Sequence, residues 1–374
     1  MNKQNPSSLA DVSKLKFDRS AVLYRQVCDA MREEIRSGRL PVGSKLPTTA
    51  ELAKAWGLQV ATVHQAMTIL AREGLLVRRP KKGTLVAEKP TKIEKLGLLA
   101  LPHADSERFK LSIMQWLQDL ASARGISTVL VDRSDLVFSN ENRQPNPHAL
   151  GFDALIGVGY NKEAVKRLSR LPVPTAFLSS SRLPNTVEVD SDDFFTRAVH
   201  SLSIQGAKSV SLLTHMDLAG AAGSGILNDL IETLLPRLVA EAGMRLIPAP
   251  PLRFKPREED FTPSEMEHVG FDLFEDLWQQ PTRPEGLIVY PSTVSRGVVT
   301  SILSHQVNVP ADLKVVLTRT KETPFLCPFP ASIFETSTEV IAGALLDIVG
   351  SQFEGRTSDF KLLGMELLVS SSRE

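Results

Sequence analysis

The stretch from Ser44 to Val86 constrains this chain more than any other, because it predicts two short helices followed by a basic two-stranded ribbon. Thr48 can cap a helix, and Glu51 three residues later completes a capping box, so we expect a helix to begin there. Gly57 supplies a stop for this helix. The first helix is therefore short and sharply bounded at both ends.

A second helix is expected to begin near Gln59, because apolar side chains then recur at helical spacing with polar ones between them. Gly74 should end it, and a strand, a cationic tip at residues 78–83 and a returning strand should follow. Two helices joined by a short turn and followed by a basic ribbon are the parts of a winged helix-turn-helix, whose second helix enters the major groove. DNA is the expected ligand.

Residues 23–86 resemble the DNA-binding domain of the GntR family of bacterial transcription regulators. The matching pieces lie in order and without gaps: Leu23-Tyr24, Ile35-Arg36-Ser37-Gly38-Arg39-Leu40, Pro41-Val42-Gly43-Ser44-Lys45-Leu46-Pro47, Glu51-Leu52-Ala53, Thr62-Val63, Ala66, Glu73-Gly74-Leu75 and Arg79-Pro80-Lys81-Lys82-Gly83-Thr84. Ala50, Gln59-Val60 and His64 stand where the family commonly has arginines or a Ser-Arg pair. These departures imply an operator that differs from the family's usual sequences, and phosphate contacts that depend on the wing.

The candidate DNA-contacting residues lie on the first helix's cap, the exposed start of the second helix and the wing. They are Thr48, Thr49, Gln59, Ala61, Thr62, His64, Gln65, Arg78, Arg79, Lys81, Lys82 and Gly83. Glutamine suits adenine, alanine and threonine methyls suit thymine, histidine can donate to guanine, and the wing cations suit phosphates. The open alternatives are that several helix residues contact only phosphate or water, and that the wing is an uninvolved basic turn.

The charge distribution fits an N-terminal part that binds DNA. Residues 1–90 hold 16 Lys+Arg against 8 Asp+Glu, a net of +8, whereas residues 91–374 hold 27 against 35, a net of −8. This asymmetry is expected when only the N-terminal part contacts a polyanion. Cys28 and Cys327 fall in different predicted domains, and no apolar run has the length of a signal peptide or membrane span. We expect a cytoplasmic protein without a structural disulfide.

Four segments are expected along the chain: a disordered leader at 1–19, a winged helix-turn-helix domain at 20–88 (the head), a linker at 89–95, and an α/β body at 96–374. Strand and helix patterns alternate through the body in two runs that break near residues 191–208. Such alternation predicts two parallel-sheet lobes covered by helices. Ligands of these sheets bind beyond the carboxyl ends of the strands, so the cleft between the lobes is the expected site.

The body resembles the effector-binding domain of the LacI/GalR family, which is similar to periplasmic sugar-binding proteins. The likeness is carried by the order of elements and by Gly97-Leu98-Leu99, Asp153-Ala154-Leu155-Ile156, Val189-Asp190 and Pro310-Ala311-Asp312-Leu313-Lys314-Val315-Val316. A GntR-like head on such a body is similar to regulators of the arabinose-repressor type. The resemblance implies effector contacts at Phe109, Tyr160, Ser181, Arg182, Asp190, Tyr290 and Arg319.

The sugar-binding pattern of that family is incomplete here. Arg319 stands where the family commonly has an aspartate, and Tyr290-Pro291-Ser292 replaces an Asn-Asp pair. Two interpretations remain open: an anionic ligand held by Arg182 and Arg319, or a cleft that binds nothing. Phe109 is equally suited to the core and to a ligand shelf.

We therefore expect a homodimeric, ligand-responsive repressor of a carbohydrate-use operon, which binds a pseudo-palindromic double-stranded DNA operator and takes a sugar or sugar phosphate as effector. The alternative is a constitutive DNA-binding regulator whose body serves only dimerisation or partner docking. The basic head disfavours a transport component, and the body is too short for a fused aminotransferase. No cofactor, metal or membrane partner is expected, and no catalytic motif of the His-Glu-x-x-His, Walker or Gly-x-Ser-x-Gly type occurs.

Overall fold

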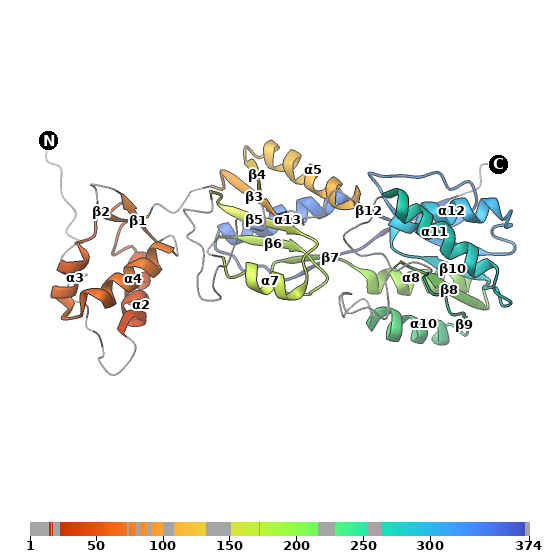
Figure 1. Ribbon diagram of the computed structural model, residues 1–374, viewed down its shortest axis with the longest axis horizontal. Helices are drawn as coiled ribbons and strands as arrows, with labels where there is room; N and C mark the ends of the chain where they lie inside the picture. Colours follow the sequence, from red (N-terminus) through yellow and green to blue (C-terminus); the bar gives the residue numbers. More distant parts are fainter. Residues whose placement is uncertain are drawn as a thin grey trace. The chain divides into compact units, whose positions relative to one another are not determined.

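The computed structural model describes residues 15, 17, 23–72, 75–79, 83–87, 92–99, 108–131, 151–171, 173–215, 229–252 and 263–370. Within these ranges the chain forms a small helical head with a two-stranded ribbon, followed by a body built on two six-stranded sheets. Figure 1 shows these elements along the chain. The predicted fold class, a winged helix-turn-helix followed by a parallel-sheet α/β body, is confirmed.

The head contains the elements α2 (Leu23–Arg36), α3 (Thr49–Trp56), α4 (Val60–Arg72), β1 (Leu76–Arg79) and β2 (Gly83–Val86). Its core forms because each helix presents one apolar stripe to the others. Val27 and Met31 of α2, Leu52 of α3, and Val63 and Leu70 of α4 are all buried in it. The three helices therefore pack against one another, and the outer face of α4 stays exposed to solvent.

Two residues of the expected disordered leader lie against this head. Phe17 meets Trp56 edge-on, with ring centroids 5.4 Å apart, and Leu15 packs against the same core. Edge-to-face aromatic pairs of this kind contribute about 1 kcal/mol beyond their buried area. The polar composition of the leader gave no sign of this contact, because it joins residues far apart in the sequence.

The first sheet of the body has the strand order β13-β7-β6-β5-β3-β4 and forms the N-terminal lobe. Its strands are β3 (Lys95–Leu99), β4 (Ser127–Val131), β5 (Ala154–Val158), β6 (Thr175–Leu178), β7 (Thr186–Val189) and β13 (Lys361–Leu363). Its helices are α5 (Arg108–Ala123), α7 (Lys162–Leu168) and α13 (Thr338–Phe353). Strand β7 pairs in parallel with both β6 and β13, as the alternating pattern predicts.

The second sheet has the order β14-β12-β11-β10-β8-β9 and forms the C-terminal lobe. Its strands are β8 (Ser209–Leu213), β9 (Arg245–Leu246), β10 (Gly286–Val289), β11 (Lys314–Thr320), β12 (Ala331–Thr336) and β14 (Glu366–Ser370). Its helices are α8 (Ser191–Ile204), the short π-helix η2 (Leu230–Leu234), α10 (Leu235–Glu241), α11 (Pro263–Trp278) and α12 (Ser292–Ser304). Strand β14 runs antiparallel to its neighbour β12 at one edge of this sheet.

Both faces of this second sheet are covered by helices. Leu287 and Val289 of β10 pack in one core with residues of α11 and α12, while Ile288 between them packs in another with residues of α8 and α10. Successive strand residues point to opposite faces, so a strand covered on both sides must be apolar throughout. This explains the continuous apolar run Gly286–Val289.

Helices α11 and α12 pack with their backbones in close contact, because each helix has a glycine where the two cross. A Cβ atom at Gly297 would lie 1.8 Å from the carbonyl oxygen of Glu267, and one at Gly270 would lie 2.2 Å from that of Val294. Any side chain at these positions would push the helices apart. Neither glycine stands out in the sequence, because the partner atoms belong to the other helix.

The chain passes between the lobes three times, after β7, after β12 and after β13. The sequence pattern instead predicts two successive runs, with the last helix in the second lobe. That expectation is wrong: α13 packs on α5, β6 and β7 of the N-terminal lobe, and β13 adds to the same sheet. Strands β12 and β13 were not anticipated. The sequence pattern also predicts a helix over residues 225–242; residues 225–228 lie outside the described part, and η2 and α10 occupy residues 230–241.

Candidate DNA interface and effector site

The start of α3 is built by a reciprocal cap. The amide of Glu51 donates to the Thr48 hydroxyl at 3.2 Å, and the Glu51 carboxylate accepts from the Thr48 amide at 2.7 Å. These hydrogen bonds from Thr48 lower the pKa of the Glu51 carboxyl below its usual value. Gly57 then takes the left-handed conformation with φ 62° and ends the helix. The predicted capping box and stop are therefore present.

Helix α4 follows after a three-residue turn and presents the predicted base-contacting residues to solvent. Gln59, Ala61, His64 and Gln65 are exposed, and Thr62 is half-buried. The opposite face of the helix is buried in the head's core. Because nothing in the described structure covers the outer face, α4 has the shape that entry into a major groove requires.

The wing is a hairpin in which Arg79 of β1 pairs with Gly83 of β2. Arg78 is exposed, and its Nη2 donates a 3.4 Å hydrogen bond to the Thr68 hydroxyl of α4. Gly83 has φ 91°, a conformation that glycine adopts without strain. Lys81 and Lys82 lie outside the described residues, as does the side chain of Arg79.

One segment that pairs with the wing was missed in the sequence. Residues 44–46 run alongside β2: the Leu46 amide donates to the Thr84 carbonyl oxygen at 2.8 Å, and the Val86 amide donates to that of Ser44 at 2.9 Å. Lys45 thereby pairs with Leu85 in a bridge. The segment has no strand-like length, so only its pairing reveals it.

Arg182, one of the predicted effector residues, belongs to an ion cluster beside the passage from β7 to α8. Arg182 lies 2.8 Å from the Asp192 carboxylate of α8 and 3.5 Å from the Glu188 carboxylate of β7. Burial raises the pKa of Glu188, and the nearby Arg182 partly opposes this. Within the described residues, the buried hydroxyls of Ser179 and Ser181 have no hydrogen-bond partner. Arg182 is therefore already neutralised, while hydroxyls beside it are free.

Asp190 and Tyr290 both support the start of α8. The Asp190 carboxylate accepts a 3.1 Å hydrogen bond from the Asp193 amide and caps the helix. The Tyr290 hydroxyl lies 3.0 Å from the Ser191 hydroxyl, and its ring stacks on Phe194 with centroids 5.4 Å apart. Burial raises the pKa of Tyr290 above its usual value. Both residues thus have internal roles that the sequence did not reveal.

The other three predicted effector residues lie on β11, after β5 and on α5. Arg319 of β11 lies directly opposite Glu335 of the neighbouring strand β12, with Nε 2.8 Å and Nη2 2.6 Å from one carboxylate oxygen. Tyr160 is buried against Phe177, with ring centroids 6.4 Å apart, and Phe109 is half-buried on α5. Arg319, like Arg182, is therefore paired with a carboxylate.

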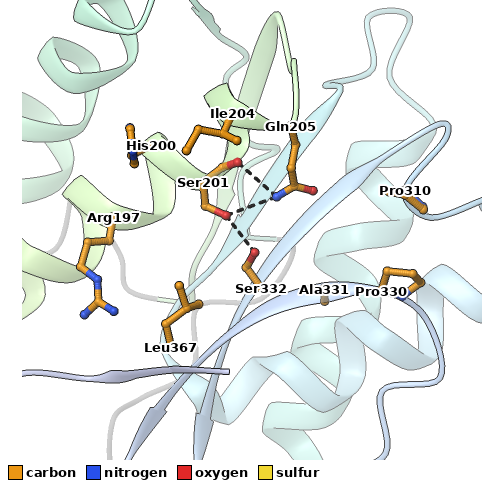
Figure 2. Close-up of a pocket in the computed structure, with 10 residues that line it drawn as sticks. All are labelled: Arg197, His200, Ser201, Ile204, Gln205, Pro310, Pro330, Ala331, Ser332 and Leu367. Atoms are coloured by element: carbon orange, nitrogen blue, oxygen red, sulfur yellow. Dashed lines mark hydrogen bonds between the residues drawn. The ribbon is translucent and has the colours of Figure 1, made fainter. Parts of the chain in front are cut away.

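A shallow pocket of about 390 Å³ lies elsewhere, on the α8 face of the C-terminal lobe. Figure 2 shows the residues that line it, among them Ser201 and Ser332, which are joined by a hydrogen bond. Its lining is Arg197, His200, Ser201, Ile204, Gln205, Pro310, Pro330, Ala331, Ser332 and Leu367. No predicted effector residue belongs to this set, so the pocket is distinct from the expected site.

The comparison with known families decides the nature of the head. Residues 23–86 match the family described as "Bacterial regulatory proteins, gntR family". Residues 23–86 are a GntR-family helix-turn-helix domain. The bounds of this GntR domain coincide with the start of α2 and the end of β2.

Curated relatives share a segment of this length. An HTH-type transcriptional regulator of Mycobacterium tuberculosis is 39% identical over 79 residues, which are 21% of this chain and 29% of that protein. The mannosyl-D-glycerate transport/metabolism system repressor MngR of Escherichia coli K12 is 34% identical over 86 residues, 23% of this chain and 36% of that protein. The matches thus span about a third of each relative's length.

The body has the fold of LacI-type regulators. A crystal structure of the lac repressor dimer, bound to operator and the anti-inducer ONPF, superposes with a TM-score of 0.56 over 75% of this chain and 93% of that chain, at 18% identity. The predicted combination of a GntR head and a LacI-like body is confirmed. In the part of the chain that the structure describes, no helix is long and apolar enough to cross a membrane.

Proposed function

We propose that this protein is a sequence-specific DNA-binding transcription regulator, and that it represses its target genes until a small molecule binds the body. The observation that carries the proposal is the GntR domain, whose exposed α4 face stands beside a wing cation, Arg78. MngR, which shares this domain, is named a repressor. No catalytic step is assigned to the chain.

The proposed DNA complex contains two copies of the chain on one pseudo-palindromic operator. Base edges are read by Gln59, Ala61, Thr62, His64 and Gln65, while Thr48, Thr49 and the wing residues Arg78, Arg79, Lys81, Lys82 and Gly83 meet the backbone. Symmetric dimers match half-sites about one helical turn apart. The lac repressor structure, a dimer on its operator, supports this arrangement for the shared body fold.

The chemistry at the ends of β6 and β7 favours a neutral, hydroxyl-rich effector over a phosphorylated one. An anionic ligand needs an available cation, but Arg182 and Arg319 are both engaged by carboxylates. The unpartnered hydroxyls of Ser179 and Ser181 can instead bond to ligand hydroxyls, since buried polar atoms normally have partners. We propose a sugar or polyol that binds the regulator's two conformations with different affinity.

The second candidate function is a constitutive DNA-binding regulator whose body only dimerises or docks a partner. Tyr290 favours it, because this side chain fills space against Phe194 and bonds to Ser191 at the expected ligand site. In that case no small molecule changes operator affinity. The two functions share the same DNA interface and differ only in the body.

The DNA-binding function is tested by footprinting the full-length protein on genomic DNA and measuring duplex affinity against salt. Reversing the charge of Arg78, Arg79, Lys81 and Lys82 should weaken binding and flatten its salt dependence, because each phosphate that a cation neutralises adds about 0.9 to the log–log slope. If the reversed protein binds as the wild type does, the function is refuted. Calorimetry against sugars and sugar phosphates, followed by operator titrations, separates the ligand-responsive from the constitutive candidate.

A further inference from the structure

Backbone hydrogen bonds of the residues next to Lys45 hold this segment against the wing. The hydrogen bonds of its two neighbours, from the Leu46 amide to Thr84 and from the Val86 amide to Ser44, fix its position along β2. The Gly43 amide adds a third bond to the Val86 carbonyl oxygen at 3.0 Å. Lys45 thus belongs to a short segment bridged to β2, although no pairing was predicted there.

The Lys45 side chain runs along the outer face of this ribbon toward its tip. Leu46 and Val86 point into the head's core, so Lys45, the residue next to Leu46, points outward and is exposed. The position that a Cβ atom of Gly83 would occupy is 3.2 Å from Cε of Lys45. The lysine therefore lies across the bare backbone of Gly83, two residues along the strand from its bridge partner Leu85.

The charge of Lys45 is not neutralised within the head. In the described ranges no carboxylate forms an ion pair with it. Glu51, whose pKa is lowered chiefly by hydrogen bonds from Thr48 and only slightly by Lys45, already uses its carboxylate in the helix cap. A cation that is exposed, unpaired and carried by a backbone segment hydrogen-bonded to β2 has the properties that a phosphate contact requires.

We propose that Lys45 is a phosphate-binding residue of the DNA interface, placed beside Gly83 near the tip of the wing. The proposal rests on the DNA-binding function proposed above and adds a contact from outside the hairpin. It explains how the head compensates for Ala50, which offers no charge at the start of α3. The ligand group is a backbone phosphate, so the contact strengthens binding to every sequence alike.

The test compares full-length wild type with Lys45→Gln on a mixed-sequence DNA duplex, by fluorescence anisotropy over a series of KCl concentrations. For each bound copy of the chain, removal of one phosphate contact should make the log–log slope shallower by about 0.9 and weaken binding roughly fivefold to tenfold near 0.1 M salt. Lys45→Arg keeps the charge and should retain the wild-type slope. Lys361→Gln, which removes an exposed lysine from β13 of the body, is the matched charge control and should change neither quantity.

The outcomes separate this proposal from the function on which it rests. If Lys45→Gln keeps the wild-type slope while Arg78→Gln flattens it, Lys45 makes no phosphate contact and DNA binding stands. If the slope falls equally in Lys361→Gln, the effect is one of net charge and the proposal is refuted. If the wild type shows no salt-dependent duplex binding at all, both the function and the contact are refuted. Circular dichroism confirms that each variant is folded.

Discussion

The hydroxyl of Thr68 accepts a 3.4 Å hydrogen bond from Arg78 of the wing and donates a 2.8 Å bond to the carbonyl oxygen of His64 in α4. One threonine thus joins the cationic ribbon to the turn of helix that carries His64 and Gln65. Because both contacts are intramolecular, the spacing between the wing and α4 is set before DNA binds. Preorganisation of this kind lowers the ordering cost of association.

Arg78 and Thr68 should therefore affect DNA binding in different ways. Arg78→Gln removes a charge, so the salt dependence of duplex affinity should flatten by about 0.9 in log–log slope for each bound copy of the chain. Thr68→Val removes only an exposed hydrogen bond, worth about 0.5 kcal/mol, so affinity should fall about twofold at an unchanged slope. Anisotropy titrations at several salt concentrations measure both. A flattened slope in Thr68→Val would contradict the assignment of the charge effect to Arg78.

Gly297 should tolerate no side chain. Its Cβ would lie 1.8 Å from the Glu267 carbonyl oxygen, a backbone atom that cannot move without displacing α11. We expect Gly297→Ala to lower the free energy of unfolding by about 3 kcal/mol, since overpacking at a backbone contact is poorly relieved. Gly343→Ala is the matched control: it lies inside α13 with no atom within 4 Å of the new Cβ, so it should be neutral or stabilising by up to about 1 kcal/mol.

Urea unfolding of the two glycine variants measures both changes. Equal stability of Gly297→Ala and Gly343→Ala would show that the α11–α12 crossing can widen freely. That result would contradict a close approach of the two helices that depends on glycine.

The stability of the body should depend on pH through Glu188. Burial raises the pKa of this carboxyl above its ordinary value of 4.5, so the folded state holds the proton more tightly than the unfolded state does. The resulting stabilisation is complete below pH 4.5 and is lost as the pH rises through the folded-state pKa. Glu188→Gln avoids this loss, so its melting temperature relative to wild type should rise between pH 4.5 and neutrality.

Arg182→Gln should change the same pH dependence in the opposite direction. It removes the cation that partly lowers the pKa of Glu188, so its deficit relative to wild type should grow as the pH rises. Thermal melts of both variants across this range provide the measurement. If Glu188→Gln loses stability relative to wild type with rising pH, the ion pair outweighs burial and the stated direction is wrong.

The pair formed by Arg319 and Glu335 should keep the expected effector site from binding anions. Arg319→Gln leaves a carboxylate that is only 11% exposed without its cation, and we expect a loss of about 2 kcal/mol in unfolding free energy. Glu335→Gln instead frees the guanidinium. Phosphate should then raise the melting temperature of Glu335→Gln more than that of wild type, because a ligand that binds only the folded state stabilises it. Equal shifts would mean that the pair leaves Arg319 available.

Much of the head could be predicted from the sequence because its signals are local. Thr48 and Glu51 form a cap within four residues, and Gly57 ends the helix by its own backbone conformation. The bridge between Lys45 and Leu85 could not be predicted in the same way, because these residues are forty positions apart in the sequence and are joined only by pairing. The contact between Phe17 and Trp56 escaped for the same reason.

The sequence by itself determined the GntR domain, the alternation of strands and helices, and the division of charge between head and body, since each depends on neighbouring residues or on composition. Only the tertiary structure decided that α13 returns to the N-terminal lobe and that Arg182 and Arg319 face carboxylates. Glu335 lies opposite Arg319 because β11 and β12 pair in one register among several that their apolar pattern allows. Strand register and chain crossings depend on contacts between distant residues, so they alone fix which charges remain free for a ligand.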